Sequence, residues 1–274
     1  MLIIQSIVNI SEVNFYIMSS IIKLRGKGVS RIINSKVMLS PLAGVTDKIF
    51  RKLVRKWAPE SLLFTEMINA TSLKHGYGTQ KIKQLELEKG PIGVQIFDNR
   101  PFAVSEAAKL AEDSGAFLID INMGCPVKKI SRKGGGSALI NDRLLAIELV
   151  KRVSNAVKVP VTVKTRLGWE NKEENIEEFL LSLQDAGAEM ITLHGRTRKE
   201  GFSGKADWEM IGKIKELLEI PVIANGDIKN PKDAFNCFKK TNADGLMIGR
   251  GILGSPWKIG EIDYAIKELK GFKE

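Results

Sequence analysis

Eight short apolar segments recur along this chain, and helical segments stand between most of them. The segments expected to be strands are residues 37–40, 62–66, 92–97, 117–122, 161–165, 190–194, 221–225 and 245–248. Helices are expected at residues 48–57, 101–114, 142–157, 173–186, 208–218 and 231–239, and residues 67–90 form a mixed excursion over the surface. Such alternation is typical of parallel βαβ units, and eight of them predict an α/β fold, the closed (β/α)8 TIM barrel.

An open, doubly wound sheet is the alternative arrangement of the same units. Such sheets usually carry a G-x-G-x-x-G turn after their first strand, and no such turn follows residues 37–40. The barrel is therefore favoured, at residues 36–256. Residues 1–35 are expected to form an N-terminal lead, part of it disordered, and Met18 is an alternative start within it.

Polar side chains or glycines stand at or just after the end of nearly every expected strand. They are Glu66, Gln95, Asn122, Cys125, Lys164, Arg166, His194, Arg196, Asn225, Gly226, Asp227, Gly249 and Arg250, and Pro41, Leu42 and Ala43 follow the first strand. The carboxyl ends of barrel strands meet at one face, where these barrels hold their chemistry. Singly, each could be a solvated loop residue. If all of them were buried at one face without hydrogen-bond partners, each unpaired polar group would cost ~1–3 kcal/mol. Taken together, they therefore predict a site that binds a ligand.

The stretch from Leu118 to Leu139 carries the most reactive group of this set. A strand leads into a loop with Asn122, Gly124 and Cys125, followed by a basic run that includes Lys128 and Lys129 and by three glycines. A lone cysteine more often packs than reacts. Its place at the mouth of a rigid strand makes Cys125 the candidate for chemistry.

The glycine-bearing loops after the last two strands have a specific use in barrels. These are Asn225-Gly226-Asp227 and Gly249-Arg250-Gly251. This pair of loops commonly binds a phosphate through backbone N–H groups. The residues alone thus predict a barrel enzyme that holds a phosphorylated ligand.

The net charge of +10 suggests a polyanionic partner. Nucleic acid is the leading candidate for this partner, and an anionic membrane surface is the second. Alternatively, the positive charge only keeps the protein soluble. Cys125 and Cys237 match neither a zinc site nor a disulfide framework, and two histidines do not make a histidine-rich site, so no metal is expected. The apolar first 22 residues match neither a signal peptide nor a membrane span. A cytoplasmic protein without membrane attachment is expected.

The residues around Cys125 resemble the tRNA-dihydrouridine synthases, within them the bacterial branch. The family's signature stands here as Ile119-Asp120-Ile121-Asn122-Met123-Gly124-Cys125-Pro126. Further blocks match in order at residues 41–47, 93–95, 163–166, 194–198, 225–227 and 247–250, and the resemblance covers residues 36–263.

The resemblance implies a flavin enzyme that reduces particular uridines of tRNA to 5,6-dihydrouridine, with FMN as cofactor and NADPH as reductant. Hydride would pass from reduced FMN to uracil C6, and Cys125, as a thiol, would protonate C5. The residues it assigns to FMN are Pro41, Leu42, Ala43, Gln95, Lys164, His194, Asn225, Gly226, Asp227, Gly249 and Arg250. Those it assigns to the substrate are Asn122, Arg166, Arg196, Lys128 and Lys129.

The C-terminus departs from the resemblance. Family members append a helical domain that grips tRNA, whereas here one amphipathic segment, residues 259–269, follows the barrel. We expect residues 257–274 to be a remnant of that domain, and the chain to act as a monomer. Two other functions stay open: a barrel flavoenzyme that reduces a free pyrimidine, as dihydroorotate and dihydropyrimidine dehydrogenases do, and a non-catalytic tRNA-binding protein.

Overall fold

The computed structural model describes residues 21–83, 85–170 and 175–271. Most of the expected N-terminal lead lies outside the described residues. So do the first two positions of the helix expected at residues 173–186 and the last three residues of the chain.

Parallel strands form a closed ring in the structure. They are β3 (Val37–Leu39), β4 (Leu63–Phe64), β6 (Ile92–Phe97), β7 (Leu118–Asn122), β8 (Val161–Arg166), β9 (Ile191–His194), β10 (Val222–Asn225) and β11 (Gly245–Ile248). Each strand pairs with the next, and β11 returns to β3 with Met247 opposite Met38. The predicted TIM barrel is confirmed. The doubly wound alternative is wrong, because such a sheet would leave its outer strands unpaired.

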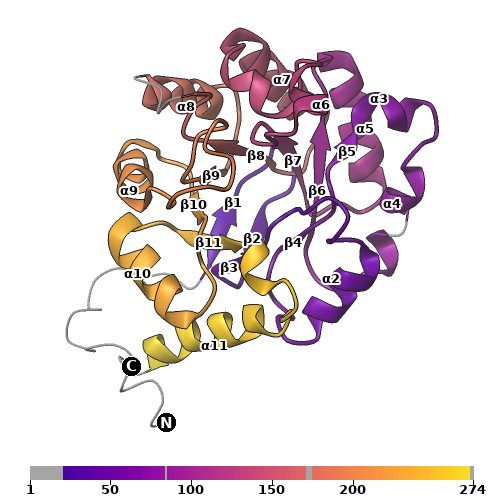
Figure 1. Ribbon diagram of the computed structural model, residues 1–274. Helices are drawn as coiled ribbons and strands as arrows, with labels where there is room; N and C mark the ends of the chain where they lie inside the picture. Colours follow the sequence, from indigo (N-terminus) through magenta and orange to yellow (C-terminus); the bar gives the residue numbers. More distant parts are fainter. Residues whose placement is uncertain (1–20, 84, 171–174, 272–274) are drawn as a thin grey trace.

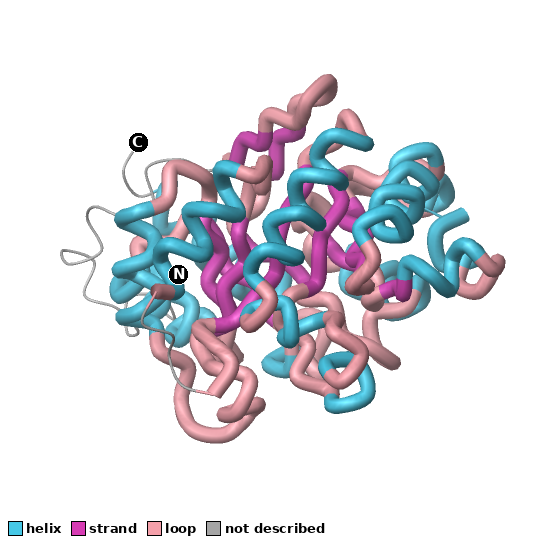
Figure 2. Tube along the Cα trace, turned by 90° about the horizontal axis from the view of Figure 1, so that it is seen from above, coloured by secondary structure: helices cyan, strands magenta, loops and turns pink. Residues whose placement is uncertain are grey.

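Helices surround this ring, as Figure 1 shows, and Figure 2 shows them flanking the strands from the side. They are α2 (Lys48–Arg55), α5 (Pro101–Asp113), α7 (Arg143–Ala156), α8 (Ile176–Asp185), α9 (Trp208–Leu217), α10 (Pro231–Thr241) and α11 (Lys258–Gly271). Four begin at a side-chain cap, in which Asp47, Asp142, Asp207 or Asn230 accepts the backbone N–H three residues on. Such caps satisfy N–H groups that the first helical turn leaves unpaired.

Shorter elements fill the connections. Between β4 and β6 lie β5 (Ile68–Asn69), α3 (Ala70–Lys74), α4 (Thr79–Lys83) and η2 (Leu85–Leu87), where the sequence predicted only a surface excursion. The loops after β7 and β11 hold α6 (Lys128–Ser131), η3 (Gly136–Ile140) and η4 (Arg250–Ile252). The amphipathic segment expected near the C-terminus is α11, which buries Ile259, Ile262 and Ile266 against the barrel.

An antiparallel hairpin that the sequence pattern did not predict lies at the end of the barrel at which the strands begin. It pairs β1 (Ile22–Leu24) with β2 (Arg31–Ile33). Ile22, Leu24 and Ile33 are buried in one cluster with residues at the starts of the barrel strands, Met38 and Leu118 among them. In Figure 1 the hairpin lies across the middle of the ring. Among the described residues, the hairpin thus covers this end of the barrel.

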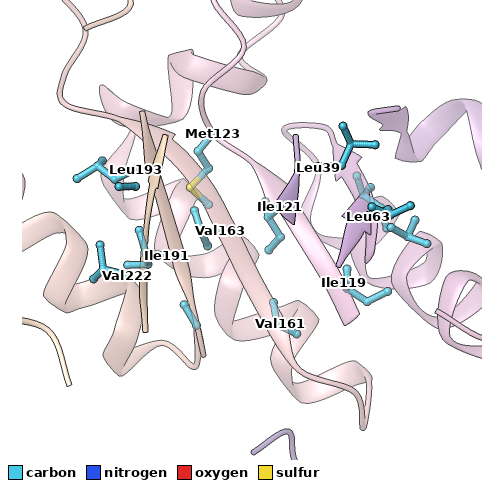
Figure 3. Close-up of a cluster of buried hydrophobic side chains, with 14 of the residues drawn as sticks. Leu39, Leu63, Ile119, Ile121, Met123, Val161, Val163, Ile191, Leu193 and Val222 are labelled. Carbon is cyan, nitrogen blue, oxygen red and sulfur yellow. The ribbon is translucent and has the colours of Figure 1, made fainter. Parts of the chain in front are cut away.

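Alternation along the strands sorts side chains into two layers. In β7, Ile119 and Ile121 pack outward with the helices, and Val161 and Val163 of β8 do the same. Figure 3 shows these outward side chains between the strands and the helical shell. The intervening residues point into the barrel, because side chains on a strand alternate between its two faces. Burial of each outward aliphatic side chain contributes about 1.5–3 kcal/mol, so this layer fixes which residues face the interior.

Candidate active site

A cavity of about 770 Å³ opens at the carboxyl ends of the strands. Sites for small ligands typically occupy roughly 300–1,000 Å³. The predicted residues that line it are Pro41, Leu42, Ala43, Gln95, Asn122, Cys125, Lys164, Arg166, His194, Arg196, Asn225, Gly226, Asp227, Gly249 and Arg250. Lys128 and Lys129 do not line it; they lie exposed on α6, three and four residues after Cys125. Met67, after β4, lines it too, so one cavity unites residues from all eight barrel strands or the loops that follow them.

The inward alternation explains why these polar groups meet. Gln95, Asn122, Lys164, His194 and Asn225 occupy inward positions near the ends of β6, β7, β8, β9 and β10. Strand register sets neighbours side by side, with Asn122 opposite Lys164 and His194 opposite Asn225. The floor of the cavity is therefore built on rigid strands rather than on loops, which suits a site that must hold reacting groups in place.

The loop that carries Cys125 is held from both sides. The side-chain oxygen of Asn122 accepts the backbone N–H groups of Gly124, at 3.1 Å, and of Cys125, at 2.9 Å. Arg166 Nε donates to the carbonyl of Gly124 at 2.7 Å, and the Cys125 carbonyl accepts the N–H of Ser137 at 3.1 Å. Burial raises the pKa of the Cys125 thiol above its ordinary value of 9.0, so the group stays protonated at neutral pH.

The close approach of the following loop to Cys125 requires glycine. Gly136 has φ +60°, and a Cβ at this position would lie 3.0 Å from the Cys125 carbonyl oxygen. Glycine adopts this left-handed conformation without the steric cost that other residues meet. The glycine run seen in the sequence thus lets the chain fold back over the cysteine.

Cations gather on one side of the cavity. Lys164 Nζ donates to Asn225 Oδ1 at 3.0 Å, and the Asn225 amide donates to the Met247 carbonyl at 2.7 Å. Burial, together with Arg166, lowers the pKa of Lys164 to about 8, and burial lowers that of Arg166 to about 10. Arg250 is exposed at the rim. Positive charges packed this closely disfavour one another, so an anionic ligand in the cavity would relieve the repulsion.

His194 lies among these cations as a neutral imidazole. Burial, and then Lys164 and the neighbouring arginines, lower its pKa to about 2. Its Nδ1 is buried and has no hydrogen-bond partner among the described residues. A buried polar atom without a partner is costly, which marks this nitrogen as a contact for a bound molecule.

Asp227 and Arg196 pair with each other in the structure. Arg196 Nη2 lies 2.8 and 2.9 Å from the two carboxylate oxygens, one of which also accepts the Ala206 N–H at 2.7 Å. Arg196 is 2% exposed and also donates to the carbonyls of Ser203 and Gly204. The pair therefore ties the loop after β9 to the loop after β10. The Asp227 side chain is committed to Arg196, so only its backbone is left to meet a phosphate.

Glycines let the loop after β10 approach both the loop after β9 and the loop after β11. A Cβ on Gly226 would lie 2.7 Å from Ala206 Cβ, and one on Gly251 would lie 2.1 Å from the Ile228 carbonyl oxygen. No other residue fits at these positions without moving the backbone. The two loops that the sequence predicted as a phosphate site are thus packed together beside Arg250.

Arginine side chains stack against aromatic rings in the loops after β8 and β9, where sequence reasoning selected no aromatic residue. The Arg250 guanidinium lies 4.2 Å from the centre of the Phe202 ring, and that of Arg198 lies 4.5 Å from the Trp169 ring. Phe202 lines the cavity and is 56% exposed. A large exposed aromatic at a cavity mouth is a surface for a planar ligand. Its only sequence signal was its place in the loop after a strand.

Asp120 and Thr162 are further residues that sequence reasoning left without a role. Both are fully buried inside the barrel, one layer below the cavity floor. The alternation in LIDIN and VTVKTR could have found them, since it places Asp120 on the face of Asn122 and Thr162 on the face of Lys164 and Arg166.

No helix in the described part of the chain combines the length and apolar character needed to cross a membrane.

Comparison with known proteins gives consistent matches. A sequence model of the family described as Dihydrouridine synthase (Dus) matches residues 38–272. The chain is 51% identical over 238 residues to a protein of Synechocystis sp. named probable tRNA-dihydrouridine synthase 1, covering 87% of this chain and 67% of that protein. It is 42% identical to tRNA-dihydrouridine synthase B of Xanthomonas axonopodis pv. citri, covering 84% of this chain and 69% of that protein.

The fold also matches solved structures. Histamine dehydrogenase from Rhizobium sp. 4-9 superposes with a TM-score of 0.69 at 14% identity, over 94% of this chain and 49% of that one. At so low an identity the match bears on the fold alone.

Proposed function

The chain belongs to the dihydrouridine synthase family, and from that membership we propose that it reduces uridine bases of tRNA to dihydrouridine, with FMN as cofactor and NADPH as reductant. The observation that carries the proposal is the position of Cys125. Its thiol lines the same cavity as Gln95, Asn122 and Lys164, beside a cluster of cations. A proton donor and an anion-binding pocket are thereby joined in one site.

Two features of the cavity support FMN as its ligand. FMN carries a phosphate and a ring system that is anionic when reduced, and Lys164, Arg166 and Arg250 supply positive charge. His194 Nδ1 lacks a partner that a ligand would provide. We propose that Gln95, Lys164 and His194 meet the ring. The phosphate would lie against the backbone of residues 225–227 and 249–250, with Pro41, Leu42 and Ala43 lining the cavity opposite.

Each residue's part in the chemistry follows from its environment. FMN, when bound and reduced, would supply the hydride for C6 of the uracil. The Cys125 thiol then donates its proton to C5, where negative charge develops. The raised pKa of Cys125 keeps that proton in place at neutral pH, and hydrogen bonds between the loop and the side chains of Asn122 and Arg166 hold Cys125 at the cavity.

RNA recognition would use the rim. The target base must leave its stack to reach the cavity. Phe202 and Trp169 offer aromatic faces for bases, and Lys128 and Lys129 on α6 offer cations for phosphates, so binding should depend strongly on salt. We further propose that the protein acts in the cytoplasm, as a monomer.

The deciding experiment follows the flavin spectrum. The purified protein is reduced anaerobically with NADPH, and tRNA lacking dihydrouridine is then added. Return of the oxidised spectrum with tRNA, and dihydrouridine in the recovered RNA, is the expected result.

Separate additions of UMP and orotate distinguish the other functions. Reoxidation by a free pyrimidine but not by tRNA would replace the proposal with a free-pyrimidine reductase. A protein that binds tRNA but no flavin would be a non-catalytic RNA-binding protein.

A further inference from the structure

A row of hydrogen bonds runs from the barrel interior to the Cys125 loop. Gln95 Nε2 donates to Asp120 Oδ2 at 2.6 Å, and Asn122 Nδ2 donates to Gln95 Oε1 at 2.8 Å. Asn122 Oδ1 in turn accepts the N–H of Cys125 at 2.9 Å. At the inner end, Thr162 Oγ1 donates to the other Asp120 oxygen at 2.6 Å. The side chains of Gln95, Asp120, Asn122 and Thr162 are all buried, with exposed fractions of 0–7%.

The two ends of this row determine the orientation of the amides between them. An ionised carboxylate only accepts hydrogen bonds, and a backbone N–H only donates. Gln95 must therefore turn its NH2 toward Asp120 and its oxygen toward Asn122. Asn122 must turn its NH2 toward Gln95 and its oxygen toward the loop. Reversing either amide would set donor against donor or acceptor against acceptor.

We propose that Asp120 is a positioning residue: its carboxylate fixes the orientation of the Gln95 and Asn122 amides, and through them the Cys125 loop and the edge that Gln95 presents to the cavity. This inference deepens the proposed function and rests on it for the identity of the ligand. Asp120 itself does not line the cavity, so it acts only through its neighbours.

Stability of the fold alone does not explain a carboxylate at position 120. Its carboxylate is fully buried, its hydrogen bonds come from neutral groups, and burial raises its pKa to about 6. The charged form is thus disfavoured where it lies. Asp98 is the contrasting case. Burial disfavours its charge too, but hydrogen bonds from Arg100 and Thr71 lower its pKa overall, as expected of a carboxylate that stabilises the fold.

The first test moves the carboxylate along the row. The Asn122→Asp variant places a carboxylate on each side of the Gln95 amide. The NH2 of Gln95 can donate a hydrogen bond to only one of them, so the urea midpoint of the cofactor-free protein should fall. Adding Asp120→Asn leaves one carboxylate, at position 122. The side-chain amide of Gln95 can then turn around, so that its oxygen accepts a hydrogen bond from the NH2 of the new asparagine at position 120 and its own NH2 donates to the carboxylate at position 122. Every polar group in the row then has a partner. We expect the double variant to regain most of the lost stability. If the changes in urea midpoint of the two single variants simply add up to the change in the double variant, positions 120 and 122 are not coupled and the proposal is wrong.

The second test asks whether Asp120 acts on the site. Asparagine at position 120 can present either its oxygen or its NH2 to Gln95, so the orientation is no longer fixed from this end. Asp120→Asn should keep or raise the urea midpoint. It should nevertheless weaken FMN binding roughly 3–10-fold, the value of one hydrogen bond, and speed alkylation of Cys125 by iodoacetamide.

Two features make the readouts specific. Cys237 is fully buried, with a pKa raised to about 12 by burial, so alkylation of the folded protein reports on Cys125. Asp98→Asn is the matched control, since Asp98 is a buried carboxylate outside the cavity; it should lower the midpoint without changing FMN affinity.

An Asp120→Asn protein that binds FMN and alkylates Cys125 like the parent would overturn the proposal. Neither readout requires tRNA. A parent that binds FMN but never reduces tRNA would reject the proposed function and leave the result on Asp120 standing.

Discussion

The ammonium group of Lys164 on β8 lies 3.0 Å from the side-chain oxygen of Asn225 on β10, and so reaches across β9 on the cavity floor. The hydrogen bond holds a buried cation in place although its pKa is lowered to about 8 by burial and Arg166. Asn225 is itself anchored to the Met247 carbonyl of β11. Residues of β8, β10 and β11 together hold the positive charge of Lys164 at the cavity.

Replacing Lys164 by methionine should weaken FMN binding, because the substitution removes a cation that faces an anionic ligand while it keeps the aliphatic stem. A decrease of about 10-fold or more is expected for one charge-assisted hydrogen bond. Fluorescence titration measures it, with Lys151→Met on the exposed face of α7 as control. The parent's affinity should also fall as pH rises through about 8, where Lys164 loses its proton. Equal affinities of the Lys164 variant and the parent would exclude this role.

Replacing Cys125 by alanine should slow turnover by about 10²–10⁴-fold and leave FMN bound. A positioned general acid contributes about 10²–10⁴-fold to rate, and the loop is held by backbone and Asn122 hydrogen bonds that alanine keeps. Stopped-flow reoxidation with tRNA measures the effect, with Cys237→Ala as the control that keeps turnover. Since burial raises the thiol pKa, turnover of the parent with FMN kept saturating should not decline through loss of this proton until above pH 9.0. An alanine variant as fast as the parent would mean that the proton comes from another group.

Removing the Asp227 carboxylate should destabilise the protein by about 3 kcal/mol, because it leaves the Arg196 guanidinium buried without its charge partner. Urea unfolding of Asp227→Ala measures this. Glu209→Ala, which breaks an exposed pair with Lys240, should cost under about 1 kcal/mol. Burial opposes the charge on Asp227, but hydrogen bonds from the Ala206 N–H and Arg196 lower its pKa. Its contribution is therefore present above pH 3.8 and disappears as pH falls below that value. Equal destabilisation of the two variants would contradict the buried-pair argument.

Replacing Lys128 and Lys129 by alanine should weaken tRNA binding without affecting FMN. Each phosphate interaction that the substitutions remove should reduce the slope of log affinity against log salt by about 0.7–0.9. Filter binding across a salt series gives the slope, and the double variant Lys151→Ala with Lys213→Ala, which removes two exposed lysines from α7 and α9, is the charge-matched control. An unchanged slope would place the RNA on another face of the barrel.

Replacing Phe202 by alanine should raise the KM for tRNA with little change in FMN affinity. A base stacked on an aromatic ring contributes about 1–3 kcal/mol, so a rise of about 5-fold or more is expected. Tyr264→Ala, which removes an exposed aromatic from α11, provides the control. A Phe202 variant with the parent's KM would show that no base stacks on this ring.

Much of the fold follows from local sequence. The strand expected at residues 92–97 is β6, Ile92–Phe97, and that at 245–248 is β11, Gly245–Ile248. Barrel strands are buried on both faces, so they stand out as apolar runs between polar helices. Because every strand ends at the same face, the sequence also placed Cys125, Lys164 and His194 together before their distances were known.

The tertiary structure decided what these residues do for one another. Nothing local foretold that Arg196 would be buried against Asp227, that the β1–β2 hairpin would cover one end of the barrel, or that Asp120 would orient Gln95. Such partners lie tens of residues apart in sequence, and they meet only through strand register and closure of the ring. The apolar pattern determined the barrel and the face of its site, since burial acts residue by residue. Hydrogen-bond direction and ion pairing depend on the distance between two side chains, and only the closed barrel sets that distance.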